Sequence, residues 1–171
     1  LLNFFNFKMR LKLNKKKMNK LANEIGFDVP ISLQKKNTFL TGRKNEILRL
    51  NRSFNLNLLI VYPNLISSTK KIYKKNKKIS LQKKKSLFYA KKSKNLINLL
   101  KKENNDLQET AIKIYPTIKK IINYIESQKG CYFSRITGSG SACIGIFSSI
   151  RDAICARRLV KLKYPKYWCA V

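Results

Sequence analysis

The segment "RITGSGSACIGIF", residues 135–147, holds the most suggestive chemistry in the sequence. Two glycines, Gly138 and Gly140, alternate there with Ser139 and Ser141 between two β-rich runs. Because glycine tolerates positive φ, successive backbone N–H groups can converge on an anion, and the hydroxyls add donors. A plain hairpin turn would need the same glycines for the same reason. Local sequence leaves both interpretations open, but it excludes a Walker loop, since no G-K-[ST] follows.

A carboxylate in "NEIGFDVPISL", residues 23–33, is the second candidate. Asp28 is one of three aspartates in a chain with 38 basic residues. It follows a helical pattern that stops at Gly26 and precedes Val29, which the next residue, a proline, is expected to hold in an extended conformation. An aspartate at such a boundary is commonly a turn or capping residue. Alternatively, it accepts a proton from a substrate hydroxyl during group transfer. Its neighbours alone favour the turn role.

Hydroxyl side chains also gather in "VYPNLISSTKKIY", residues 61–73. Ser67, Ser68 and Thr69 stand at an expected helix start, with Tyr73 one turn later. A helix start with hydroxyls suits a phosphate or diphosphate, and an aromatic ring there can stack on a base. The alternative, helix capping plus a core tyrosine, is favoured by this stretch alone.

The periodicity of apolar residues predicts the helices and strands that must position these residues. A strand is expected over 54–63 and a helix over 106–127, with Pro116 predicting a kink or restart and Asp106 and Glu109 at capping-box spacing. The C-terminal order is strand 131–136, glycine turn 137–141, strand 142–148, helix 149–162 and strand 167–171. From residue 54 onward this order predicts an α+β fold, an antiparallel sheet with helices on one face.

The preceding half is organised less clearly. Residues 1–27 predict two helices, the second ending at a glycine, and "DVPISL" and "NTFLTGRKNEILRL" predict extended pieces joined by turns. Residues 69–102 predict short helices with a mobile stretch around 74–85. The first residue, Leu1, and the apolar "YWCAV" end suggest a piece of a longer protein.

Charge and cysteines narrow the class of protein. The net charge is +30, but only eight of the 38 basic residues are arginine, the preferred reader of phosphates and bases, which favours compositional bias over nucleic-acid binding. The four cysteines form no C-x-x-C pair and there is no histidine, so no metal site is predicted. No apolar run reaches the ~18 residues of a membrane helix. Reduced core thiols predict a cytoplasmic protein.

Four blocks in order, "LANEIGFDVPISL", "LLIVYPNLISSTKKIY", "NDLQETAIKIYPTIKKI" and "SRITGSGSACIGIF", carry a more specific signal. Together they resemble the GHMP kinase superfamily, and within it the members that phosphorylate the 2-hydroxyl of 4-diphosphocytidyl-2-C-methyl-D-erythritol in the non-mevalonate isoprenoid pathway. The resemblance implies a two-domain fold, with 1–50 closing the N-terminal domain and 51–171 forming a ferredoxin-like C-terminal domain. It implies ATP and Mg²⁺ as cofactors, small-molecule partners, and no specific nucleic acid or membrane.

The resemblance also assigns roles. Asp28 matches the "G-x-D-V-P" block, which implies the catalytic base, and Thr69 and Tyr73 match the cytidyl-diphosphate segment, with Tyr73 stacking on cytosine. The loop that borders the phosphate-transfer centre would comprise Gly138, Ser139, Gly140 and Ser141.

Several family features are altered. Gln108 stands where the family's "N-D-L-E" helix start has Glu, and "TGRKNEI" replaces a glycine-rich "E-G-x-G-E" turn, of which only Glu46 remains. The family's early lysine and "GLGGGSS"-like ATP loop have no counterpart in these residues, so the chain alone is expected to be inactive. Two alternatives stay open: a GHMP kinase for another alcohol, and a basic nucleic-acid-binding α+β protein.

Overall fold

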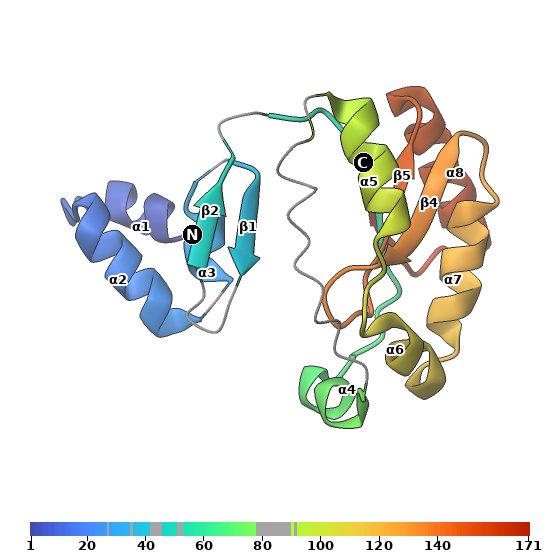
Figure 1. Ribbon diagram of the computed structural model, residues 1–171, viewed down its shortest axis with the longest axis horizontal. Coiled ribbons are helices and arrows are strands. Elements are labelled where there is room, and N and C mark those ends of the chain that lie inside the picture. The colour runs from blue at the N-terminus through green and yellow to red at the C-terminus, as the bar shows by residue number, and fades with distance from the viewer. Residues whose placement is uncertain (27, 35, 42–45, 51–52, 78–89, 91) are drawn as a thin grey trace. The chain divides into compact units, whose positions relative to one another are not determined.

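A computed structural model describes residues 1–171 except 27, 35, 42–45, 51–52, 78–89 and 91. The chain divides into two compact units, Leu1–Phe54 and Asn55–Val171 (Figure 1). Each unit is described by itself below.

The described residues of the first unit form three helices and a two-stranded antiparallel sheet. Its elements are α1 (Leu2–Lys8), α2 (Lys15–Ile25), α3 (Val29–Ser32), β1 (Thr38–Thr41) and β2 (Glu46–Arg49). The Asn14 side chain caps α2 by accepting a 3.0 Å hydrogen bond from Lys17 N, and α2 ends at Gly26. β1 and β2 pair antiparallel, with Thr38 opposite Arg49. The predicted pair of helices and the glycine stop are confirmed, as are the extended pieces where β1 and β2 lie; residues 42–45 between them are outside the described residues.

The expected extended conformation of "DVPISL" is wrong, because these residues form α3. Pro30 lies in the first turn of α3, where its missing N–H costs no helical hydrogen bond and its fixed φ suits the helix. The Pro30 side chain is buried. Its burial and this favourable helical position outweigh the pre-proline preference of Val29 for extended backbone.

The second unit is built on a four-stranded antiparallel sheet. Its strands are β3 (Asn57–Tyr62), β4 (Cys131–Ile136), β5 (Cys143–Phe147) and β6 (Trp168–Ala170). Their order is β4-β5-β3-β6, and every neighbouring pair is antiparallel. With helices between β3 and β4 and between β5 and β6, this is the ferredoxin-like arrangement predicted from the sequence.

Helices cover both faces of this sheet. They are α4 (Thr69–Lys75), α5 (Ser93–Lys102), α6 (Gln108–Ile114), α7 (Thr117–Glu126) and α8 (Ile150–Lys163). α7 and α8 pack on the face that carries Leu59 and Phe147 (Figure 1). The core on that face comprises Leu59, Val61, Ile72, Ala111, Ile118, Ile121, Ile122, Ile125, Ile136, Cys143, Phe147, Ala153, Ala156 and Val160.

The position of α5 differs from the prediction, which placed the helices on one face of the sheet. Arg135 of β4 points away from the α7 side, since the adjacent Ile136 belongs to the core on that side. Its guanidinium donates to the carbonyls of Leu100 and Glu103 at the end of α5. α5 therefore lies on the opposite face of the sheet.

The predicted helix over 106–127 is two helices. α6 ends before Pro116, and α7 restarts at Thr117 with Pro116 as its N-cap, which confirms the restart. The predicted capping box is wrong, because α6 begins only at Gln108. Its N-cap is Leu107, which makes no side-chain capping hydrogen bond. Of the stretch expected to be mobile, residues 74–75 end α4, and 78–85 lie outside the described residues.

Candidate functional site

The glycine-rich segment is the loop that joins β4 to β5. Thr137 N donates to Ala142 O at 2.9 Å, and Gly140 N donates to Thr137 O at 3.0 Å. Gly138 and Gly140 have φ of +56° and +83°, in the region that side-chain-bearing residues rarely adopt. The loop is thus a hairpin connection with left-handed glycines, one of the two interpretations that the sequence left open, and its further role depends on what surrounds it.

Hydroxyl groups from the start of α4 contact this loop directly. Thr69 Oγ1 and Ser139 Oγ lie 2.9 Å apart, across 70 residues of sequence. Ser67 Oγ donates to the backbone carbonyl of Ser139 at 3.4 Å, and the buried Ser141 donates to the carbonyl of Leu65. Two segments that the sequence singled out separately therefore form one cluster of hydroxyl groups, here called the Thr69–Ser139 cluster (Thr69, Ser139, Ser67 and Ser141).

The helix that carries Thr69 presents an aromatic ring beside it. Ser68 caps α4 by accepting a hydrogen bond from Lys71 N at 3.2 Å. Ile72 is fully buried, whereas Tyr73 is 62% exposed, so the expectation of a core tyrosine is wrong. Thr69 and Tyr73 are four residues apart and lie on one side of the helix. The ring is therefore accessible on the side of α4 that faces the glycine loop.

A third segment holds the glycine loop from the other direction. Asn105 Nδ2 donates to the carbonyl of Gly138 at 2.8 Å and to that of Ile136 at 3.2 Å. Asn105 Oδ1 accepts from Leu107 N at 2.9 Å, and Gln108 Oε1 accepts from Ile136 N at 3.0 Å. A glutamate oxygen at position 108 could accept the same bond, so the replacement of the family's glutamate preserves the contact.

The third candidate, Asp28, lies in the first unit just before α3. Asp28 lies in a turn, as its neighbours favoured, but its exposed side chain makes no capping hydrogen bond to α3. Its backbone is held, because the Asp28 carbonyl accepts from Ser32 N at 3.4 Å and from Ser32 Oγ at 3.2 Å. Asp28 therefore presents a carboxylate to solvent from a fixed backbone.

One arginine fixes the helix that follows Asp28. Arg49 Nη2 donates to Pro30 O at 2.6 Å, and Arg49 Nη1 donates to Ile31 O at 3.3 Å and Thr38 Oγ1 at 3.1 Å. Sequence reasoning did not identify this residue. A signal existed, because arginines are few in this lysine-rich chain and the fixed fork of a guanidinium suits several acceptors at once.

Two of the four thiols are held in an unreactive form by burial. All four cysteines are free, as predicted, but Cys155 is exposed. Burial raises the pKa of Cys143 to about 12, and burial together with Glu126 raises that of Cys131 to about 11. Both thiols are therefore protonated at neutral pH and are poor nucleophiles. Within the described ranges, no group of three His, Cys, Asp or Glu side chains could hold a metal ion.

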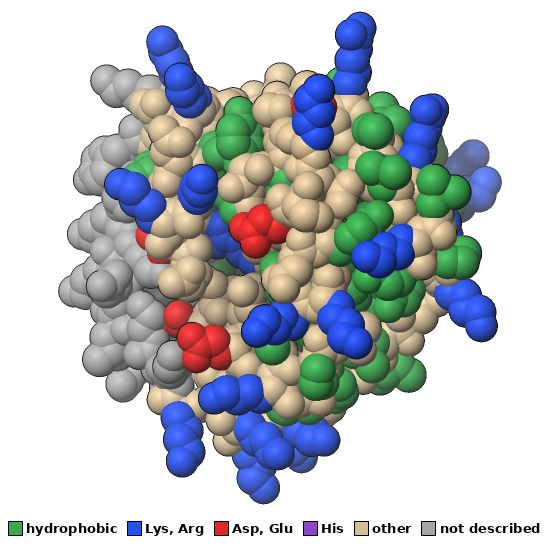
Figure 2. Space-filling view, turned by 90° about the vertical axis from the view of Figure 1, so that its right-hand side faces the viewer, with side chains coloured by type: hydrophobic (Ala, Val, Ile, Leu, Met, Phe, Trp, Pro, Cys, Tyr) green, Lys and Arg blue, Asp and Glu red, His purple; other side chains and the backbone are tan. Residues whose placement is uncertain are grey.

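The basic side chains form no single band on the face shown in Figure 2. Lysines and arginines are scattered there among hydrophobic and uncharged side chains, with few acidic groups. A continuous basic stripe would be expected of a nucleic-acid interface. None of the helices in the described part of the chain has both the length and the apolarity needed to span a bilayer.

This chain is similar in sequence to proteins of known family. Residues 86–165 match the family described as GHMP kinases C terminal. A 4-diphosphocytidyl-2-C-methyl-D-erythritol kinase from Wolbachia of Drosophila simulans is 37% identical over 154 residues, covering 88% of this chain and 52% of that protein. The protein of the same name from Pelagibacter ubique is 33% identical over 173 residues, covering 99% and 59%. The chain thus spans little more than half the length of these curated relatives.

Two solved structures share the fold. A crystal structure of 4-(cytidine 5'-diphospho)-2C-methyl-D-erythritol kinase aligns with a TM-score of 0.65 at 19% identity, covering 96% of this chain and 59% of that one. Homoserine kinase from Cytophaga hutchinsonii aligns with a TM-score of 0.69 at 15% identity, covering 98% and 61%. At these identities the likeness concerns the fold alone.

Proposed function

We propose that this chain belongs to the GHMP kinase family and forms the C-terminal part of an ATP-dependent kinase acting on 4-diphosphocytidyl-2-C-methyl-D-erythritol. The kinase would phosphorylate the 2-hydroxyl of that substrate during isoprenoid precursor synthesis. Residues 1–50 would close the N-terminal domain, and 51–171 would be the C-terminal domain. The free thiols support a reducing, cytoplasmic location.

The Thr69–Ser139 contact carries this proposal. It brings two hydroxyls within 2.9 Å of each other beside a glycine loop with left-handed backbone. Hydroxyls in such a position can donate to the oxygens of a diphosphate. The exposed ring of Tyr73 lies on the same side of α4, where it can stack on cytosine. A cytidyl diphosphate needs both features together.

Asp28 would act as the base that takes the proton from the attacking hydroxyl. Its side chain is exposed and its backbone is fixed, so the carboxylate can reach a bound alcohol without disturbing α3. ATP and Mg²⁺ would be the cofactors, and the ion supplies neutralisation of phosphate charge when bound. The described residues hold no acidic cluster, which fits an ion held mainly by nucleotide phosphates.

We expect the 171-residue chain to show no useful turnover by itself. Phosphoryl transfer depends almost wholly on positioning and charge stabilisation, and these residues contain no counterpart of the family's ATP loop. ADP production at a rate comparable to that of the Wolbachia relative would contradict this expectation.

Substrate binding tests the C-terminal site on the chain as it stands. Calorimetric titration with 4-diphosphocytidyl-2-C-methyl-D-erythritol should give saturable binding, weakened about tenfold or more by Tyr73→Ala, as expected for loss of one stacked base. The matched control is Tyr132→Ala, which removes another exposed tyrosine, on β4. Equal weakening by both variants, or no binding, would overturn the assignment of Thr69 and Tyr73.

Activity requires a complete kinase, which a chimera can provide. The first part of the Wolbachia relative, up to the start of the aligned region, would be joined to Leu1 of this chain. The chimera should phosphorylate the cytidyl substrate in preference to homoserine. The reverse preference would favour the second candidate, a GHMP kinase for another alcohol; homoserine is the test alcohol because a homoserine kinase shares the fold.

A further inference from the structure

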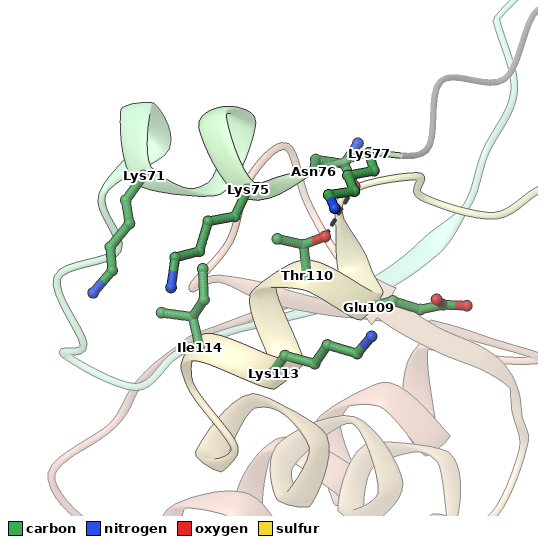
Figure 3. A pocket seen from close by; sticks show the side chains of 8 residues that line it. All are labelled: Lys71, Lys75, Asn76, Lys77, Glu109, Thr110, Lys113 and Ile114. Atoms are coloured by element: carbon green, nitrogen blue, oxygen red, sulfur yellow. Dashed lines mark hydrogen bonds between the residues drawn. The ribbon is translucent and has the colours of Figure 1, made fainter.

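A basic cavity lies between α4 and α6, apart from the Thr69–Ser139 cluster. It has a volume of about 680 Å³, and Figure 3 shows the side chains that line it. Its lining residues are Lys71, Lys75, Asn76, Lys77, Glu109, Thr110, Lys113 and Ile114. We call it the α4–α6 cavity.

This cavity and the proposed substrate site lie on different faces of α4. Successive helical residues are rotated by about 100°, so Lys71 lies about 200° around the helix from Thr69. Lys75 follows Lys71 by four residues and shares its face, whereas Tyr73 shares the face of Thr69. The buried Ile72 lies between the two faces and attaches α4 to the core.

The walls of the cavity are fixed to each other. Thr110 Oγ1 of α6 donates to Asn76 Oδ1, at the end of α4, at 2.9 Å. Asn76 N in turn donates to Ile72 O at 2.9 Å, which closes the last turn of α4. The lysines before and after Asn76 are therefore carried by backbone tied to α6, and the side chain of Ile114 provides an apolar surface between the walls (Figure 3).

The charge in the cavity is strongly unbalanced. Among its described lining residues, four lysines stand against one carboxylate, Glu109. Glu109 is four residues before Lys113 on α6, a spacing at which opposite charges attract. Figure 3 shows Glu109 extending away from Lys71 and Lys75, whose side chains both extend from α4 toward α6. Like charges at this spacing repel, so an anion between Lys71 and Lys75 would relieve a cost already present in the fold.

We propose that the α4–α6 cavity binds a small molecule bearing two or more linked phosphate groups, with Lys71 and Lys75 as its principal contacts. Side chains one helical turn apart are separated by about 5–6 Å at Cβ, a span that adjacent phosphates of one chain can bridge. Lysine ammonium groups bind phosphate as flexible point charges. Among the described lining residues the ammonium groups are the ones that bind phosphate, so the phosphate groups are the part of the ligand that is assigned here. The proposal does not depend on the substrate assigned above.

The probe is inorganic tripolyphosphate, titrated by calorimetry into the 171-residue chain at constant ionic strength. Lys71→Ala together with Lys75→Ala should weaken its binding about tenfold or more, as expected for two lost charge-assisted contacts. The matched control is Lys70→Ala with Lys74→Ala, since these exposed lysines share the helix, spacing and charge but do not line the cavity. The control should change affinity less than about twofold, because distant surface charges act mainly through screened, general attraction.

Three results would overturn the proposal: no saturable binding, equal weakening by both double variants, or tighter binding of single-stranded RNA that displaces the probe with a steep salt dependence. Alanine favours helix, so circular dichroism should show α4 retained in both variants. Should the double variant nevertheless fail to fold, Lys75→Gln against Lys74→Gln repeats the comparison with a smaller change. Tyr73→Ala must leave tripolyphosphate binding unchanged, which separates this cavity from the cytidyl site. Equal affinity for ATP and tripolyphosphate would identify the phosphate chain as the recognised group.

Discussion

The glycine loop and the Asp28 segment are held in place by different means. The loop receives side-chain hydrogen bonds from two distant segments, through Asn105 and through the Thr69–Ser139 cluster. The backbone around Asp28 is held locally, by Ser32 and by one arginine, Arg49, while the Asp28 side chain is exposed. A ligand-binding loop gains from polar groups arranged in advance, whereas a base must remain accessible to the proton that it takes. Substitutions at these positions can test whether that difference reflects function.

The largest expected effect follows from Asp28→Asn in the chimeric kinase. Removing a general base should lower kcat by about 10²–10⁴-fold while substrate binding stays measurable, since the amide keeps the shape of the side chain but cannot take the proton. Steady-state kinetics and calorimetric titration would measure both quantities. Glu24→Gln, which alters another exposed carboxyl-bearing residue of the first unit, is the control and should leave kcat unchanged. Undiminished turnover by Asp28→Asn would remove this residue from the mechanism.

A smaller effect is expected where the Asp28 segment is held by its arginine. Arg49→Met keeps much of the aliphatic stem but removes three hydrogen bonds, two of them to carbonyls of α3. Loss of this charged donor should destabilise the first unit by about 2–3 kcal/mol. Hydrogen exchange should quicken in α3 and β1 and remain unchanged in the second unit. Arg151→Met, at an exposed position of α8, is the control. Unaltered exchange in α3 would show that Arg49 does not hold it.

Removing one contact of the glycine loop should have a smaller effect on stability, because several hydrogen bonds hold the loop in place. Asn105→Ala removes the bonds to the carbonyls of Gly138 and Ile136 and should destabilise the second unit by about 1–2 kcal/mol. Binding of the cytidyl substrate should weaken as the loop loosens. The control is Asn123→Ala, an exposed position on α7. If the two variants had the same unfolding midpoint and affinity, Asn105 would be irrelevant to the loop.

Local patterns were sufficient to predict the strands and helices that position the loop. The two β-rich runs with glycines between them predicted β4, the turn and β5, and the helix predicted over 149–162 matches α8. α3 was missed because two effects of Pro30 oppose each other, the extended preference of the preceding residue and the favourable first-turn position, and burial decides between them.

Contacts between distant segments could not be predicted from local sequence patterns. The Thr69–Ser139 contact joins residues 70 positions apart and depends on the sheet order, which no local pattern specifies. The exposure of Tyr73 depends in the same way on which face of α4 meets the core, and Ile72 decides that. The roles given to Thr69 and Tyr73 therefore came from the order of family motifs, and the structure adds the contact that joins the two motifs.

The smallest expected effect concerns the departure from the family at Gln108. Gln108 Oε1 accepts a hydrogen bond from Ile136 N at 3.0 Å, and a glutamate carboxylate can accept the same bond. Gln108→Glu should therefore change the free energy of unfolding by less than about 0.5 kcal/mol, as substitutions that preserve contacts usually do. Gln108→Leu, of similar size, leaves that N–H without its acceptor and should cost about 1–3 kcal/mol. Chemical denaturation of the three proteins distinguishes a requirement for charge from a requirement for an acceptor. If Glu stabilised the unit by as much as Leu destabilised it, charge would matter at this position, and the glutamine would weaken the support of the loop.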